Sequence, residues 1–314
     1  MSAPEILQLT PMPAGPSADL EASFEVHRFW QAADREQMIE TVAGRARGLV
    51  TNGHVGASAA LMDRLPELEL IGCFGVGVDA IDLDAARGRG VRVSNTPDVL
   101  TDAVAELALG LLLDVARRIS THERYLRAGR WVTEGDPPLA RTLAGRTAGI
   151  VGLGRIGRAT AQLCEAFGMT VVYQGPRRKP SVSYPYYTDL VGMARAVDAL
   201  MITCVGAPST RGLITAEVID ALGPDGWLVN VSRGFVVDEA ALVDALLKGR
   251  LGGAGLDVFQ HEPEVPEALL ELDNVVLQPH QASATLETRD AMGQLVVDNL
   301  KAYFAGRPLL TPVV

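Results

Sequence analysis

Residues 147–163, TAGIVGLGRIGRATAQL, decide the fold. An apolar run leads into Gly152, and Gly154 and Gly157 follow at the spacing G-x-G-x-x-G, where a helical pattern begins. The first glycine permits a tight turn, the second lets the backbone approach a pyrophosphate, and the third lets helix and strand pack closely. The spacing alone is a weak signal, because glycine-rich turns also arise from packing. Its place between a strand and a helix favours a dinucleotide-binding turn.

Apolar segments alternate with helical patterns on both sides of this turn. Six strand-like runs begin with the glycine-rich segment, namely TAGIVGL, TVVYQ, DALMITCV, WLVNVS, GGAGLDV and NVVLQ. Five short runs precede it between residues 4 and 95, namely EILQL, FEVHRFW, ARGLVT, LELIGCFG and VRVSN. Strands that alternate with helices predict parallel sheets. The predicted fold class is α/β, with two Rossmann-like or flavodoxin-like doubly wound domains and a cleft between them.

The length of 314 residues also favours two domains, since it exceeds one comfortable core. Residues 98–119 have leucine and alanine on most helical faces, which predicts a long buried helix. A last amphipathic helix is predicted over residues 284–305 and would return to the first domain. The resulting boundaries are 1–97 plus 286–314 for a discontinuous first domain and 98–285 for the dinucleotide-binding domain.

Composition argues against several classes of partner. The net charge of −10 would repel phosphate backbones and anionic lipid heads, so we expect neither nucleic acid nor a membrane as partner. Cys73, Cys164 and Cys204 are isolated in apolar surroundings without metal-type spacing, which predicts buried thiols and no metal site. The N-terminal residues do not resemble a secretion signal, and no apolar stretch reaches membrane-spanning length. A cytoplasmic protein is therefore expected.

The strand after the glycine-rich turn indicates which cofactor is bound. An NAD-binding protein usually carries an acidic residue about 20 residues beyond the turn. Here Gln174 ends the strand, and Arg177, Arg178 and Lys179 follow. Cations suit a ribose 2′-phosphate, although a basic triplet in a loop is also common as solvated surface. Because the acid is missing and bases are gained, we predict NADP as the cofactor, with NADPH preferred over NADH.

Polar groups follow three further apolar strands, at the ends where ligands bind in open α/β sheets. The segments are Asn230–Gly234, Asp257–Pro263 and Gln278–Ala284, and they supply an arginine, a glutamate and a histidine. For any one segment ordinary surface placement is the simpler explanation, but together they favour an acid–base site. His261 is a rival imidazole, but it is adjacent to Glu262 and is expected to point elsewhere.

At these residues the sequence resembles the D-isomer-specific 2-hydroxyacid dehydrogenases, from about residue 45 to the C-terminus. Six segments match the family's signatures in order: GVGVDAID (75–82), NTPDVLTDAVAELALGLLL (95–113), GIVGLGRIG (149–157), NVSRG (230–234), GLDVFQHEP (255–263) and QPHQASAT (278–285). The basic loop and the absence of a C-terminal regulatory domain make the chain most similar to the NADPH-dependent glyoxylate and hydroxypyruvate reductases. The resemblance implies that a small 2-keto acid is reduced to the D-2-hydroxy acid.

The same resemblance implies roles for individual residues. Arg233 would bind the substrate carboxylate and polarise the keto oxygen, and His280 would give that oxygen its proton. Glu262 would orient His280, since a carboxylate beside an imidazole favours the imidazolium. The backbone amides of Val76 and Gly77, in a glycine-flanked loop, would hold the other end of the carboxylate.

His54 is a further candidate for substrate contact. The first domain would thus bind substrate. By resemblance the protein is expected to be a homodimer, and the apolar stripe Val104–Leu113 would be core or dimer contact.

Cofactor contacts are implied in the same way. Arg155 and Ile156 would contribute to the pyrophosphate site and Thr210 would touch phosphate. Asp257, helped by the Val231 carbonyl, would hold the carboxamide. The full expected set is Thr101, Gly152, Gly154, Arg155, Ile156, Gly157, Gln174, Arg177, Arg178, Val205, Thr210, Val231, Arg233, Asp257, His280 and Ser283. One departure is Gly206-Ala207, where family members often carry a bulkier pair, and it leaves the local adenine or ribose contacts open.

Other assignments stay open from the sequence. A dehydrogenase of the same family could act on a phosphorylated hydroxy acid or on phosphite. Formate dehydrogenases of this fold are disfavoured, because they place glutamine where Glu262 stands. A non-catalytic dinucleotide-sensing corepressor shares the scaffold, since fold alone does not determine function.

Overall fold

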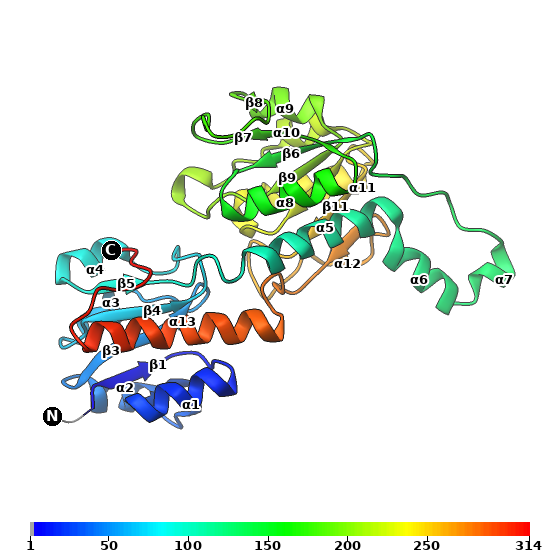
Figure 1. The fold of residues 1–314 in the computed structure, drawn as a ribbon. Coiled ribbons are helices and arrows are strands. Elements are labelled where there is room, and N and C mark those ends of the chain that lie inside the picture. The colour runs from blue at the N-terminus through cyan, green and yellow to red at the C-terminus, as the bar shows by residue number, and fades with distance from the viewer. Residues whose placement is uncertain (1–2) are drawn as a thin grey trace. The chain divides into compact units, whose positions relative to one another are not determined.

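The computed structural model describes residues 3–314, which form two compact units. Of the described residues, unit 1 comprises 3–100 and Ser283–Val314, and unit 2 comprises Thr101–Ala282. Each unit has its own parallel sheet with helices, so the predicted α/β class is confirmed (Figure 1). The sequence placed the two crossings after residues 97 and 285, close to these bounds. The assignment of substrate to one unit and dinucleotide to the other stays a prediction.

The sheet of unit 1 has the strand order β2-β1-β3-β4-β5, and all neighbouring pairs are parallel. Its strands are β1 (Glu5–Gln8), β2 (Glu25–Arg28), β3 (Ala46–Asn52), β4 (Leu70–Phe74) and β5 (Arg92–Ser94). Its helices are α1 (Ala14–Ser23), α2 (Arg35–Val42), α3 (Ala59–Asp63), α4 (Leu83–Arg89) and α13 (Leu286–Phe304), with the 3-10 turn η1 (Phe29–Gln31). The five predicted strands and the return of the last helix to this part of the chain are confirmed, because α13 packs on β4 and α1. Helix α1 was not predicted.

The sheet of unit 2 has the order β12-β11-β10-β9-β6-β7-β8. Its strands are β6 (Thr147–Val151), β7 (Thr170–Gln174), β8 (Tyr186–Tyr187), β9 (Ala199–Ile202), β10 (Trp227–Asn230), β11 (Gly253–Leu256) and β12 (Val275–Leu277). The six predicted strands are confirmed, and β8 adds an edge strand. The order reverses between β6 and β9, and such a switch point opens a crevice at the carboxyl ends of the strands.

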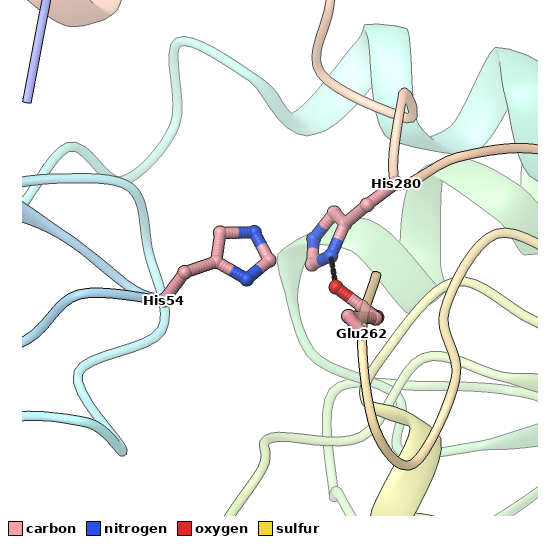
Figure 2. Close-up of side chains that lie close together, drawn as sticks. All are labelled: His54, Glu262 and His280. Atoms are coloured by element: carbon pink, nitrogen blue, oxygen red, sulfur yellow. Dashed lines mark hydrogen bonds and ion pairs between the residues drawn. The ribbon is translucent and has the colours of Figure 1, made fainter. Parts of the chain in front are cut away.

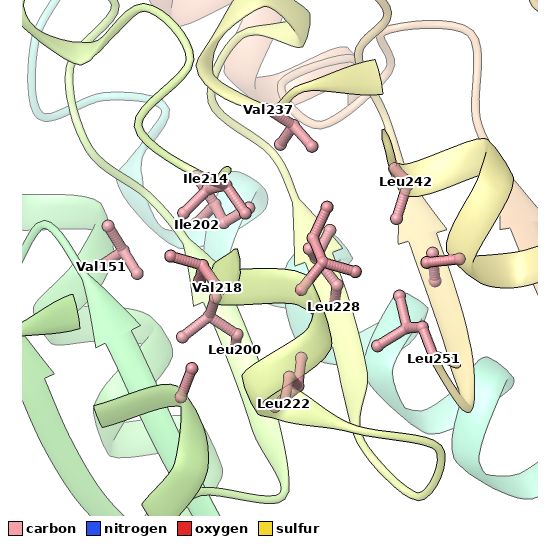
Figure 3. Close-up of a cluster of buried hydrophobic side chains, with 14 of the residues drawn as sticks. Val151, Leu200, Ile202, Ile214, Val218, Leu222, Leu228, Val237, Leu242 and Leu251 are labelled. Carbon is pink, nitrogen blue, oxygen red and sulfur yellow. The ribbon is translucent and has the colours of Figure 1, made fainter. Parts of the chain in front are cut away.

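The helices of unit 2 cover both faces of its sheet. They are α5 (Thr101–Arg117), α6 (Ile119–Arg127), α7 (Arg130–Glu134), α8 (Arg155–Ala166), α9 (Leu190–Ala196), α10 (Ala216–Leu222), α11 (Glu239–Leu247) and α12 (Glu267–Leu270), with 3-10 turns η2 (Pro208–Thr210) and η3 (Gly234–Val236). Figure 3 shows the core under α10 and α11, where Val218 and Leu242 meet Leu200 and Leu228 of the sheet. Each such buried side chain stabilises the fold by about 1.5–3 kcal/mol.

Side-chain caps define where many of the helices begin. The capping residues, each accepting a hydrogen bond from a backbone amide of the first turn, are Asp34, Ser58, Asp82, Asp189, Thr215, Asp238 and Thr285. Such a cap satisfies a donor that the helix cannot pair internally. Short polar residues before apolar periodic segments thus set the local start of these elements.

Helix α5 confirms the predicted long buried helix, although it begins at Thr101 and ends at Arg117. Within the stripe Val104–Leu113, Val104, Leu109 and Leu112 are buried in unit 2, where α5 packs on α8, β10 and β11. These side chains of the stripe are therefore core, and a dimer contact through the rest of the stripe stays a prediction.

Beyond α5, helices α6 and α7 form an arm that extends away from the sheet of unit 2 (Figure 1). Large apolar side chains of the arm are exposed, and Val132 and Leu139 are 92% and 96% exposed. We refer to residues 119–139 as the arm. Its two helices were not predicted from the sequence.

The three thiols differ in burial. Cys73 and Cys164 are buried, as predicted, whereas the expectation is wrong for Cys204, which is half-buried beside the switch point. Burial raises the pKa of the Cys164 thiol to about 12 and also raises the pKa of Cys204, so neither is poised as a thiolate. Across residues 3–314, none of the helices is both long and apolar enough to cross a bilayer.

Candidate active site

The three polar segments predicted at strand ends lie at neighbouring strands of unit 2. Arg233 follows β10, Asp257 follows β11 and His280 follows β12, and these strands are adjacent and parallel. Because parallel strands end at the same edge of a sheet, their carboxyl-terminal loops gather there. The structure thus brings the segments of Arg233, Glu262 and His280 to one edge.

Glu262 and His280 form a direct pair (Figure 2). The imidazole Nδ1 of His280 lies 2.7 Å from Oε2 of Glu262, while Oε1 of Glu262 accepts a hydrogen bond from the backbone amide of Phe259 at 2.9 Å. The side chain of His280 is 27% exposed and that of Glu262 is 20% exposed, so both are partly shielded from solvent yet reachable by a small molecule. A carboxylate that accepts the Nδ1 proton leaves Nε2 to exchange the catalytic proton. The rival His261 is exposed, and the partner of Glu262 is His280.

Asp257 holds the loop that carries His280. Its side chain is fully buried, Oδ1 accepts from the backbone amide of Gln281 at 2.6 Å, and Oδ2 accepts from that of Ala282 at 3.0 Å. The carbonyl of Asp257 also accepts from the amide of His280 at 2.8 Å. Burial raises the pKa of the Asp257 carboxyl, and the two amide donors oppose that rise. His280 itself has φ 53°, a left-handed conformation that is unfavourable for a residue with a Cβ.

Arg233 is held in a compact turn after β10. Its Nη1 donates to the carbonyl of Ser232 at 2.9 Å, and its own carbonyl accepts from Nδ2 of Asn230 at 3.0 Å. Gly206 lies against it, since a Cβ built there would be 2.6 Å from Cγ of Arg233 and 3.1 Å from Cζ of Phe235. The departure from the family pattern at Gly206 thus makes room for the arginine side chain.

The glycine-rich turn lies at the switch point of the sheet. Gly152 has φ 92°, and a Cβ there would be 2.4 Å from Cα of Cys204, so only glycine fits. Gly154 precedes α8, Arg155 and Ile156 begin it, and Gly157 is buried in its first turn. Amides at a helix start attract anions, and a narrow cradle that a Cβ would fill fits a pyrophosphate. The turn therefore suits the cofactor expected from the sequence.

The basic loop follows β7 directly. Gln174 is the last residue of that strand, and its carbonyl accepts from the amide of Gly152 at 2.9 Å. Arg177 and Arg178 are exposed in the loop between β7 and β8, and Lys179 is half-buried. The strand end next to the glycine-rich turn thus carries cations and no carboxylate, which fits a 2′-phosphorylated ribose better than a free 2′-hydroxyl.

The remaining cofactor candidates are placed as follows. Thr210 is the last residue of η2, and its hydroxyl donates a hydrogen bond to the carbonyl of Val205 at 2.9 Å. This bond closes the turn after β9. Val205 is 65% exposed and Val231 is buried after β10. Thr101 begins α5, and Ser283 is the first residue of the second segment of unit 1. Their proposed contacts stay predictions.

The substrate candidates of unit 1 lie in loops that follow β3 and β4. The Val76 carbonyl accepts from Nδ2 of Asn95 at 2.8 Å, and the Gly77 carbonyl lies 3.5 Å from Sγ of Cys73. His54 is exposed, and its amide donates to Oδ1 of Asn52 at 3.0 Å. Both loops are ordered by local hydrogen bonds, and the role of each residue toward substrate stays a prediction.

Comparison with known proteins identifies the family. The protein-family model for the NAD binding domain of D-isomer specific 2-hydroxyacid dehydrogenases matches residues 109–282. A hydroxyphenylpyruvate reductase from Plectranthus scutellarioides is 48% identical over 314 residues, the whole of both chains. A glyoxylate/hydroxypyruvate reductase A from Arabidopsis thaliana is 46% identical over 309 residues, 98% of each chain.

A solved structure agrees with these relatives. The NADPH-dependent glyoxylate/hydroxypyruvate reductase from Sinorhizobium meliloti, crystallised in complex with NADP and malonate, is 47% identical. The two structures have a TM-score of 0.94, and the match covers 100% of this chain and 97% of that one. The chain therefore belongs to the D-isomer-specific 2-hydroxyacid dehydrogenase family.

Proposed function

We propose that the protein reduces a small 2-keto acid, glyoxylate or hydroxypyruvate, to the D-2-hydroxy acid with NADPH. The observation that carries this proposal is the Glu262–His280 pair, 2.7 Å between Oε2 and Nδ1, at the edge of the sheet where Arg233 also lies. The family assignment supplies the reaction type. Two of its relatives, from Arabidopsis thaliana and Sinorhizobium meliloti, carry glyoxylate/hydroxypyruvate reductase in their names.

The side chains divide the work of the reaction. When NADPH is bound, it supplies the hydride. Arg233 binds the substrate carboxylate and stabilises negative charge on the keto oxygen, since a guanidinium stays charged and presents a fork of donors. His280 gives its Nε2 proton to that oxygen. Glu262 accepts the Nδ1 proton in a hydrogen bond, which orients the ring and stabilises the imidazolium.

The basic loop supports the cofactor preference. Charge-assisted hydrogen bonds from Arg177 and Arg178 to a 2′-phosphate are each worth about 1.5–3 kcal/mol. The double variant Arg177→Ala/Arg178→Ala is therefore expected to raise the KM for NADPH by about tenfold or more, with little change for NADH. Arg195→Ala, an exposed arginine in the last turn of α9, is the matched control. Equal changes for the two cofactors would refute the preference.

The substrate is tested by following nicotinamide oxidation with several keto acids. Glyoxylate, hydroxypyruvate, pyruvate and phenylpyruvate cover small and large side chains. Hydroxyphenylpyruvate is included because a hydroxyphenylpyruvate reductase is 48% identical over the whole chain. Fast turnover of a C2 or C3 acid supports the proposal, and preference for the aromatic acid would replace the substrate but keep the mechanism. If none of these acids is turned over, the result would favour a phosphorylated substrate or a non-catalytic, dinucleotide-sensing corepressor.

We also propose that the protein is a homodimer, with the arm as part of the interface. Leu126 and Val132 are 58% and 92% exposed, and exposed apolar clusters mark interaction surfaces. Leu126→Glu/Val132→Glu places two charges in the proposed interface and is therefore expected to yield a monomer. The monomer should stay folded, because neither side chain belongs to a core. Light scattering gives the mass, and Leu247→Glu, 58% exposed on α11, is the control. A monomeric wild type, or a double variant that stays dimeric, would contradict the proposal.

A further inference from the structure

Tyrosine hydroxyls hold the loop that carries Arg177 and Arg178 on either side of these two arginines. The hydroxyl oxygen of Tyr173, on β7, accepts a hydrogen bond from the backbone amide of Lys179 at 2.8 Å. The hydroxyl of Tyr186, on β8, donates to the carbonyl of Gly175 at 2.8 Å. The two bonds therefore bracket the exposed arginines on either side.

The two anchoring tyrosines pack against each other. Tyr173 is only 1% exposed, and its ring centroid lies 5.2 Å from that of Tyr186 at an interplanar angle of 46°. The two residues are also direct partners in the register of β7 and β8. An aromatic pair on neighbouring strands stabilises a sheet edge. The hydroxyls thus project from a fixed pair of rings to a loop that has no regular secondary structure.

A third tyrosine, Tyr184, anchors the part of the same loop that leads into β8. The hydroxyl of Tyr184 donates to Oε2 of Glu165 on α8 at 2.6 Å, and burial together with that carboxylate raises the pKa of Tyr184 to about 12. The hydroxyl is protonated at neutral pH, as in any tyrosine, and the raised pKa extends its ability to donate to more alkaline pH. It ties the loop to the helix that begins at the glycine-rich turn.

We propose that Tyr173 and Tyr186 are specificity-determining positioning residues, whose hydroxyls hold the backbone of the basic loop in the conformation that binds a ribose 2′-phosphate. This inference rests on the proposed preference for NADPH. Ordering a flexible backbone costs conformational entropy, so a loop that is already ordered binds its ligand more tightly. NADH lacks the 2′-phosphate and gains nothing from the ordered loop. The tyrosines thus favour binding of NADPH over NADH by positioning the loop, without contacting either cofactor.

The test compares Tyr186→Phe and Tyr173→Phe with Tyr187→Phe, whose ring packs against the core of unit 2. Each change removes one hydroxyl and keeps the ring. We expect Tyr186→Phe to raise the KM for NADPH about threefold to tenfold, the range of one lost hydrogen bond, with kcat and the KM for NADH unchanged. The dissociation constant of adenosine 2′,5′-bisphosphate should rise by the same factor. Amide hydrogen exchange over residues 176–184 should become faster.

Two results would overturn the inference. One is faster exchange in the loop with an unchanged KM for NADPH, and the other is an equal rise in KM for NADPH and NADH. Failure of the cofactor proposal is recognised separately, because the wild type would then use NADH as well as NADPH and Arg177→Ala/Arg178→Ala would be neutral. If Tyr173→Phe proves unstable because that side chain is buried, Tyr186→Phe alone decides the outcome.

Discussion

Replacing His280 by alanine should lower turnover of the keto acid by about 10²–10⁴-fold, the usual contribution of a general acid. The variant keeps Arg233 and the cofactor turn, so binding of both ligands should survive while the proton source is lost. Steady-state kcat, together with cofactor binding followed by nicotinamide fluorescence, measures the two effects separately. The loss should lie in kcat, because the proton is transferred only as the keto oxygen gains charge.

Two companion variants make this result specific. His261→Ala removes the exposed neighbouring imidazole and should retain near-normal rates. Glu262→Gln keeps an oxygen that can accept the Nδ1 proton but removes the negative charge, so an intermediate loss is expected. If His280→Ala kept near-normal rates, or if His261→Ala were equally slow, the acid would have to be another group.

The strands were predictable because their apolar runs lie next to turn residues. The exceptions are instructive. Strand β8 consists of Tyr186 and Tyr187 alone, which is too short for an alternating pattern. The arm was missed because its apolar residues are exposed and do not face a core; Trp131 and Val132 are examples. Such residues do not recur at the spacing of a buried helix face, which is the pattern that predicts a helix.

The candidate site was predictable to the level of segments, because parallel strands place their carboxyl-terminal loops at one edge. The contacts within it were not. The fit of Gly206 against Arg233 depends on a close approach across residues far apart in the chain. The anchoring of the basic loop depends on where the hydroxyls of Tyr173 and Tyr186 point. Spacing in the sequence carries no information on either.

Asp257 is the site residue whose observed contacts add most to its expected role. The resemblance assigns it to the cofactor carboxamide, yet both of its oxygens accept backbone amides of the loop after His280. Those bonds offset the unfavourable left-handed backbone of His280, φ 53°, which costs on the order of 1–3 kcal/mol. Without them the loop can relax, and the imidazole would leave the position set by Glu262. A displacement of about 1 Å can cost about 10²-fold in rate.

Asp257→Asn is therefore expected to lower kcat by about 10- to 100-fold and to lower the melting temperature. The side-chain shape is kept, but an NH₂ group would face one of the two amide donors, and each buried donor left unpaired costs about 1–3 kcal/mol. Asp238→Asn is the matched control, because that carboxylate also accepts a backbone amide, at the exposed start of α11, where asparagine caps equally well. The histidine ring signals in NMR spectra should shift in Asp257→Asn and stay in place in the control. A raised KM for the cofactor with unchanged kcat and ring signals would show instead that Asp257 acts on the carboxamide alone.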